Sequence, residues 1–129
     1  MKKIQKEKQD PALQAEDKSA RAVVKYLRIA PRKVRLVVDA VRGLPVDRAM
    51  SQLLLMPQKS AHEVYKTVKS AVANAENNYN LDPDGLFVSR IWANEARVLK
   101  RWRARARGRV GSVLSRSSHI TVVVDERSA

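Results

Sequence analysis

The chain has no cysteine and few aromatic residues, and each absence excludes a class of protein. Without cysteine, its 129 residues can form neither a disulfide nor a thiolate metal site, which favours a reducing, intracellular setting. No apolar run approaches the ~20 residues that span a bilayer, and residues 1–18 lack the apolar segment of a secretory signal. We therefore expect a soluble protein that is not exported. Because aromatic residues make up only 5% of the chain, a broad base-stacking surface is disfavoured.

Acidic residues are also scarce, which points to a polyanionic partner. The chain carries 13 Asp and Glu against 26 Lys and Arg, a net charge of +13, and residues 97–109 contain no acid at all. Such an imbalance destabilises the free protein and favours association with nucleic acid or an anionic membrane. We expect phosphate contacts to supply most of the affinity.

Arginine occupies every second position of residues 101–109. The arginines are Arg101, Arg103, Arg105, Arg107 and Arg109, and they alternate with Trp102, Ala104, Ala106, Gly108 and Val110. This is the period of a β-strand, in which all five arginines project from one face, whereas a helix would spread them around its circumference. Cations spaced about 6.6 Å apart cannot rest on an apolar core. The stretch therefore needs a partner rich in negative charge, and phosphate is the obvious candidate.

The rest of the chain predicts one domain behind a charged extension. Residues 1–18 mix charged and amide side chains without apolar periodicity, which predicts a flexible segment. Residues 19–129 are expected to form a single domain. It begins with a strand over residues 19–30, a stretch rich in Val, Tyr, Leu and Ile.

Three apolar stripes at helical spacing predict three helices. The first helix begins at Pro31 and stops at Gly43, and the second covers residues 46–56. The third begins at Ser60, which has capping-box spacing to Glu63, or alternatively at Pro57. The stripes consist of Val34, Val37, Val38 and Val41; of Val46, Ala49, Met50, Leu53 and Leu54; and of Ala61, Val64, Tyr65, Val68, Ala71, Val72 and Ala75.

A long hairpin is predicted after the turn-forming residues 77–85. One strand is expected to run from Leu86 to about Arg107 and a second to return from Val113, with Gly108 and Gly111 bracketing the turn. The hairpin, at residues 90–118, should have a packed root and a projecting tip that is mobile until bound. The root residues expected to face the core are Phe87, Ile91, Ile120, Val122 and Val124.

No arrangement of residues indicates catalysis or a metal site. His62 and His119 lack partners at ligand spacing, and the sequence contains neither a nucleophile elbow nor a phosphate-cradling loop. We therefore expect no enzymatic activity and no cofactor, and we interpret His119 as a surface or phosphate contact. Trp92 is interpreted as a packing residue, and Trp102 as a contact with a partner or with the hairpin itself.

Three blocks of sequence resemble the bacterial type of the ribosomal protein L22 (uL22) family. In order, they are RIAPRKVRLVVDAVRG (residues 28–43), SAVANAENN (70–78) and LKRWRARARGRVGSVLSRSSHITVVV (99–124). The resemblance implies an α+β fold, in which a small antiparallel sheet packs with three helices and a long arginine-rich β-hairpin protrudes. It also implies a structural constituent of the large ribosomal subunit in the cytoplasm. Such a protein binds 23S-type rRNA, aids its assembly and lines the nascent-peptide exit tunnel with its hairpin tip.

The resemblance and the charge pattern together assign candidate residues. Those expected to line the tunnel are Arg103, Ala104, Arg105, Ala106, Arg107, Gly108, Arg109, Val110 and Gly111. Those expected to bind rRNA are Lys25, Arg28, Arg32, Lys33, Arg35, Lys59, Lys66, Lys69, Arg97, Lys100, Arg101, Arg103, Arg105, Arg107, Arg109, Arg116 and His119. Singly, the cations of the helices fit an ordinary solvated face better, but because little acid balances them we interpret them as an extension of the RNA-binding surface. The implied partners are rRNA, the nascent polypeptide and neighbouring large-subunit proteins, with no membrane partner and no homo-oligomer.

Two alternatives to a ribosomal role remain at this point. A sequence-tolerant nucleic-acid chaperone or architectural protein would have the same charge, because phosphate contacts carry no sequence information. A membrane-surface role is less favoured, since the apolar stripes have a core-forming pattern. The chain also departs from the common pattern of the family, with Ala30 in place of Ser, Ala96 and Arg97 in place of Gly-Pro, Ala104 in place of Pro, and Gly111 in place of Asp.

Overall fold

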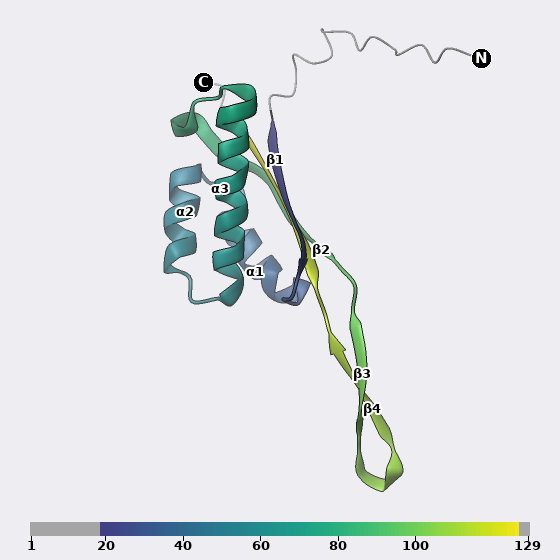
Figure 1. Cartoon of the computed structure of the whole chain (residues 1–129). Helices are drawn as coiled ribbons and strands as arrows, with labels where there is room; N and C mark the ends of the chain where they lie inside the picture. The colour runs from purple at the N-terminus through teal and green to yellow at the C-terminus, as the bar shows by residue number, and fades with distance from the viewer. Residues whose placement is uncertain (1–18, 127–129) are drawn as a thin grey trace, which may run out of the picture.

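The computed structural model describes residues 19–126 and confirms the expected α+β fold (Figure 1). The predicted extension at residues 1–18 lies outside the described residues, as do residues 127–129. Three helices and a small antiparallel sheet form the body, and a hairpin protrudes from it. In chain order the elements are β1 (Ala20–Leu27), α1 (Pro31–Val41), α2 (Val46–Leu55), α3 (Lys59–Tyr79), η2 (Pro83–Gly85), β2 (Leu86–Glu95), β3 (Leu99–Ala104), η3 (Ala106–Gly108), β4 (Val110–Ser115) and β5 (Ser118–Glu126).

The body is a two-layer structure in which all three helices cover one face of the sheet (Figure 1). The strand order is β1-β5-β2, so the last strand of the chain lies in the centre and pairs antiparallel with both neighbours. Ile120, Val122 and Val124 of β5 are fully buried against the helices, with Val64 and Val68 of α3. One face of β5 and the apolar stripe of α3 therefore meet in one core.

The helices lie where the apolar stripes place them, with two corrections. Leu54 was expected on the buried side of α2, but its side chain is 67% exposed, because Val46, Ala49 and Leu53 already fill the contact. The predicted capping box is also wrong. Helix α3 begins one residue earlier, at Lys59, so Ser60 is a buried residue of the first turn, and no side chain caps the helix.

A β-bulge in β2 overturns the expectation that Phe87 lies in the core. The pairing with β5 shifts between Val88 and Arg90, so one extra residue is inserted in this strand. A bulge of this kind moves the inward side chains from even to odd positions. Leu86 and Val88 are buried before the bulge and Ile91 after it, whereas Phe87 is only partly buried.

The free edge of β2 is covered by α1 and by the loop that follows it. The backbone N–H of Gly43 donates to the carbonyl of Val88 at 2.9 Å, and the N–H of Val88 donates to the carbonyl of Leu44 at 2.9 Å. Gly43 has a φ of +76°, a conformation that glycine adopts without strain. This covering satisfies backbone groups that would otherwise invite another strand.

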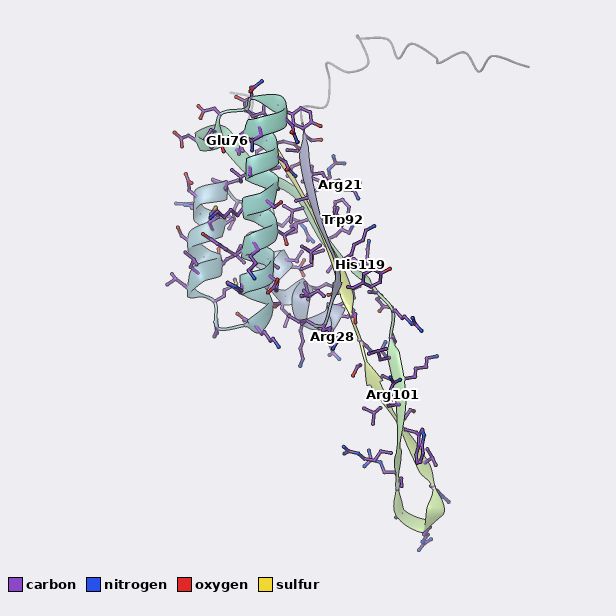
Figure 2. The ribbon with its side chains drawn as sticks, in the orientation of Figure 1. Arg21, Arg28, Glu76, Trp92, Arg101 and His119 are labelled. Carbon is purple, nitrogen blue, oxygen red and sulfur yellow. The ribbon has the colours of Figure 1, made fainter. Side chains whose placement is uncertain are left out.

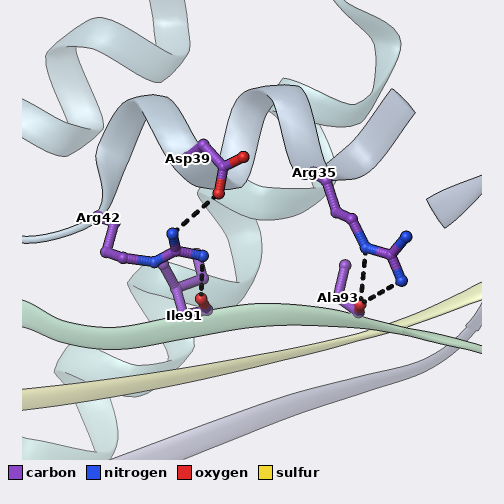
Figure 3. Close-up of polar contacts among 5 residues, drawn as sticks. All are labelled: Arg35, Asp39, Arg42, Ile91 and Ala93. Atoms are coloured by element: carbon purple, nitrogen blue, oxygen red, sulfur yellow. Dashed lines mark hydrogen bonds and ion pairs between the residues drawn. The ribbon is translucent and has the colours of Figure 1, made fainter. Parts of the chain in front are cut away.

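Arg35 of α1 and Arg42, which directly follows this helix, continue this covering toward the base of the hairpin (Figure 3). Arg42 donates through Nη2 to the carbonyl of Ile91 at 3.0 Å and also pairs with Asp39 at 2.9 Å. Arg35 donates through Nε and Nη2 to the carbonyl of Ala93, at 3.4 and 3.3 Å. Helix α1 is thereby held against the strand that leads into the hairpin.

Candidate nucleic-acid interface

The hairpin is a separate two-stranded sheet that projects beyond the body (Figure 1). The ladder of β3 and β4 runs from the pair Leu99–Ser115 to the pair Ala104–Val110. Every residue of β3 is exposed, and so is every residue of β4 except Gly111, which is half-buried. The side chains of the hairpin are therefore available to a partner on both faces.

The prediction of one continuous strand from Leu86 to Arg107 is wrong, because the chain changes sheets on the way. The β2–β5 ladder ends at the pair Glu95–Ser118, and the β3–β4 ladder starts at Leu99–Ser115. Between the two ladders, one arm of the hairpin has three residues, 96–98, and the other has only two, 116–117. Because these lengths differ, the register of the β2–β5 pairing cannot continue into the β3–β4 pairing. We call these five residues the joint. Its arms are linked by a hydrogen bond from the N–H of Ala96 to the carbonyl of Ser117, at 2.9 Å.

The expectation that five arginines share one face is also wrong. Strand alternation places Arg101 and Arg103 on a common face, but β3 ends at Ala104, so Arg105, Arg107 and Arg109 lie in the loop. Because a loop has no two-residue period, strand alternation no longer holds Arg107 and Arg109 to that face. The side chain of Arg105 stays on it, since it lies against Gly111, the residue opposite Arg103. The charge at the tip is instead distributed around a turn.

The turn itself is tight and contains a non-glycine residue in a left-handed conformation. Arg107 has φ 58° and ψ 35°, Gly108 has φ 69°, and the N–H of Arg109 donates to the carbonyl of Ala106 at 3.3 Å. These features are those of a type I′ turn, whose twist matches that of a two-stranded ribbon. The returning strand can therefore start at Val110 rather than at Val113, and Gly111 lies in the ladder opposite Arg103 instead of bracketing the turn.

The second face of the hairpin carries a cation and large apolar groups as well as small residues. It carries Lys100 and Trp102 opposite Leu114 and Ser112, in addition to Ala104 opposite Val110. The side chain of Trp102 is 72% exposed and that of Val110 is 63% exposed. Exposed cations and exposed large apolar groups on one narrow ribbon favour a partner that surrounds it.

Gly111 provides space for the side chain of Arg105. A Cβ built on Gly111 would lie 2.9 Å from Nε and 3.2 Å from Cγ of Arg105. The arginine therefore packs across the ribbon at a position where only glycine leaves room. This contact fixes one of the three tip arginines against the hairpin.

We expect the substitution Gly111→Ala to displace Arg105 without unfolding the hairpin. The clash is with a flexible side chain of an exposed loop, so the melting temperature should change by no more than about 2 °C. Two-dimensional NMR should show a large change at the Arg105 Nε–H resonance and small changes at the backbone amides of β3 and β4. Broad changes along both strands would contradict the assignment of Arg105 to this contact.

The other predicted cations do not gather into one patch. Lys59 lies between Arg28 and Lys33, in two adjoining hollows of about 380 and 280 Å³ at the end of β1 and the start of α3. Lys66 and Lys69 lie farther along α3, where Lys66 pairs with Glu63 at 3.5 Å. The structure brings Arg32, Arg35 and Arg116 together around a third hollow, beside the joint. Arg97 belongs to the joint itself.

His119 is tied to the body by a backbone contact. The N–H of Tyr26 donates to its Nδ1 at 2.9 Å, and the two rings meet edge to face with centroids 4.8 Å apart. Tyr26 has a φ of 58°, at an irregularity in the pairing of β1 with β5. The predicted phosphate contact is therefore restricted to Nε2, because Nδ1 is already occupied.

Two further cations lie on the helix-free face of the body sheet, Arg21 and Arg90, and neither was among the residues predicted from the sequence, which included Lys25 and His119 on this face. Figure 2 shows Arg21, Trp92 and His119 on this face. Lys25 of β1 is exposed as well. In the strand register, Arg21 and Arg90 flank Val123, which is only 4% exposed although no helix covers it. The signal in the sequence was the alternation of Arg21, Val23 and Lys25, which places them on one face of β1.

Comparisons with known proteins identify similar sequences over the described domain. Residues 22–125 match the family described as Ribosomal protein L22p/L17e. A protein of Chloroflexus aggregans named large ribosomal subunit protein uL22 is 52% identical over 109 residues, which cover 84% of this chain and 96% of that protein. Proteins of the same name from Clostridium novyi and Rhodospirillum rubrum are each 50% identical, covering 84% and 86% of this chain and 98% and 88% of the relatives. No helix within residues 19–126 has both the length and the apolarity to cross a bilayer.

Proposed function

The chain belongs to the ribosomal protein L22p/L17e family, and from this premise we propose that it binds 23S-type rRNA through its hairpin and the adjoining body. It is a non-enzymatic, structural constituent of the large ribosomal subunit of the cytoplasmic ribosome. The finer proposal is that it aids rRNA assembly and lines the nascent-peptide exit tunnel with residues 103–111. The nascent polypeptide and neighbouring large-subunit proteins are then its further partners.

The observation that carries the proposal is a ribbon of cations without acids, exposed on both faces. Residues 96–124 contain no Asp or Glu, while eight cations lie between residues 97 and 116: Arg97, Lys100, Arg101, Arg103, Arg105, Arg107, Arg109 and Arg116. The guanidinium group binds phosphate through a planar fork and also stacks on bases, so arginine suits a folded RNA better than lysine does. The exposed Trp102 adds a surface on which a base can stack.

The narrowness of the hairpin supports the proposed position of its tip in the tunnel wall. A two-stranded ribbon ending in a tight turn can enter a passage between RNA segments that the body is too wide to enter. Its own stability in water is marginal, which fits a segment that is held by its surroundings. The turn residues Arg105, Arg107 and Arg109 would reach farthest into that passage.

Binding to large-subunit rRNA fragments, compared with unrelated RNA of equal length over a salt series, tests the proposal. We expect a preference for the large-subunit fragments that survives raised salt, because a shaped site adds contacts beyond counterion release. Equal binding to both RNAs that collapses with salt would contradict the proposal. That result would favour the non-specific nucleic-acid chaperone instead.

Removing the three charges of the tip should weaken RNA binding without affecting the fold. The variant Arg105→Ala, Arg107→Asn, Arg109→Ala uses Asn at position 107 because its φ is positive there and Asn-Gly is favoured in a type I′ turn. If each arginine contacts one phosphate, the slope of log affinity against log salt should fall by about 2. Fluorescence anisotropy over a salt series gives the slope, and circular dichroism monitors the fold.

The matched control replaces the same three arginines with lysine, which keeps the charge but removes the planar forks. We expect this variant to keep the salt slope and to lose part of the affinity. Unfolding of the neutral variant would contradict the division of the protein into a stable body and an exposed tip. An unchanged salt slope would mean that the tip does not contact phosphate.

A further inference from the structure

A hollow lies where α1 meets the joint between body and hairpin. It has a volume of about 510 Å³ and is lined by Ala30, Pro31, Arg32, Arg35, Glu95 and Arg116. Three guanidinium groups and one carboxylate give its walls an excess of two positive charges. The ion pairs among residues 19–126 are Arg42–Asp39 and Lys66–Glu63, so neither Arg32, Arg35 nor Arg116 is neutralised by an acid there.

The body side of this hollow is held in place by hydrogen bonds. Arg35 donates from Nε and Nη2 to the carbonyl of Ala93, which leaves Nη1 free to bind a ligand (Figure 3). The loop before α1 is fixed in turn, because the hydroxyl of Ser118 donates to the carbonyl of Ile29 at 3.0 Å. The wall formed by Arg32 and Arg35 therefore keeps its position relative to the body sheet.

The opposite side of the hollow belongs to the joint. Arg116 lies between β4 and β5, in one of the two short segments that connect the hairpin to the body. The joint is spanned by the hydrogen bond of Ala96 with Ser117, and the strands beyond it are exposed along their length. A ligand that contacts Arg116 together with Arg32 and Arg35 would therefore restrain the hairpin relative to the body.

We propose that this hollow binds one backbone phosphate of RNA between Arg116 on the joint and Arg32 and Arg35 on α1, and thereby sets the direction of the hairpin. The inference rests on the proposed rRNA binding and assigns it one composite site. Charge-assisted hydrogen bonds from arginine to phosphate oxygens are short and directional, and several guanidinium groups can share one phosphate. RNA is favoured over a free phosphate ion because the hairpin that continues from this site has the charge to follow the same strand.

A double-mutant salt series tests whether one phosphate is shared. Arg32→Ala and Arg116→Ala should each weaken binding to the large-subunit rRNA fragment by about tenfold. Arg35 is left intact because it also holds the carbonyl of Ala93. If both arginines bind the same phosphate, the double variant should lose about one unit of salt slope, whereas two separate phosphates would cost about two. Arg48→Ala, an exposed cation of α2 outside the hollow, is the charge-matched control and should change little.

The direction of the hairpin can be measured separately, with spin labels on cysteines introduced at Asn77 of α3 and Ser112 of β4, both exposed. The chain has no native cysteine, so labelling is confined to these sites. The distance distribution should narrow when the rRNA fragment binds. At saturating RNA, the distance distribution should stay broad in the Arg116→Ala variant. In the control variant Arg48→Ala it should narrow as it does in the unchanged protein.

Three outcomes would overturn the inference. The first is that the losses of salt slope in Arg32→Ala and Arg116→Ala add up in the double variant. The second is that RNA narrows the spin-label distance distribution equally with and without Arg116. The third is that inorganic phosphate at matched ionic strength narrows this distribution as much as RNA does, which would identify a free ion as the ligand. Each leaves the proposed function intact as long as the unchanged protein still prefers large-subunit rRNA. Loss of that preference in the unchanged protein would contradict the proposed function itself.

Discussion

Replacing residues 97–116 with Asn-Gly is expected to leave the body folded and to abolish most of its RNA affinity. The hydrogen-bonded residues Ala96 and Ser117 would then flank a two-residue loop, for which Asn-Gly is the favoured type I′ sequence. The core contains no residue from the deleted segment, so the melting temperature should shift by no more than about 4 °C, equivalent to ~1 kcal/mol.

The affinity should fall because eight of the 26 cations are removed at once. Even if only half of them contact phosphate, binding to the large-subunit rRNA fragment should weaken by about a hundredfold or more at ~0.1 M salt. Anisotropy titrations measure the affinity, and circular dichroism melting measures stability. The Lys-substituted tip described above is the control, because it keeps the length of the hairpin and its charge. A shortened protein that fails to fold would show that the hairpin contributes to the body, and one that binds rRNA as before would place the interface elsewhere.

Truncation of a central core residue should have the largest effect on stability. Ile120 lies on β5 between both neighbouring strands and is fully buried. Ile120→Ala leaves a cavity against the helix layer, so the free energy of unfolding should fall by about 2–5 kcal/mol. Urea unfolding followed by circular dichroism at 222 nm measures this change.

Leu114→Ala is the matched control for this substitution, since Leu114 lies on the hairpin and is 45% exposed. We expect it to cost less than about 1 kcal/mol. Its effect on RNA binding should exceed its effect on stability, because the side chain faces the partner and not the core. Equal losses of stability in the two variants would contradict the separation of the protein into body and hairpin.

Local pattern and composition determined a large part of this protein. The valine stripe from Pro31 and the alanine- and valine-rich stripe of α3 each bury one face of a helix. The apolar run of β5 is buried on both faces, and the structure contains all three elements. The excess of cations follows directly from the sequence, and the sequence blocks that resemble the L22 family point to the family that the comparisons identify. These properties depend on residues a few positions apart, so neighbouring positions are sufficient to predict them.

Only the tertiary structure decided where the pairing of the strands changes. Three features depend on the register between distant arms. They are the bulge that turns Phe87 out of the core, the joint that divides the predicted long strand, and the turn that releases Arg107 and Arg109 from the common face. The same is true of Arg35, which appears in the sequence as a free cation and in the structure holds a carbonyl of β2. A two-residue period predicts which face a side chain is on only while the strand keeps one partner strand and one register. Here the partner strand changes from β5 to β4 between Glu95 and Leu99.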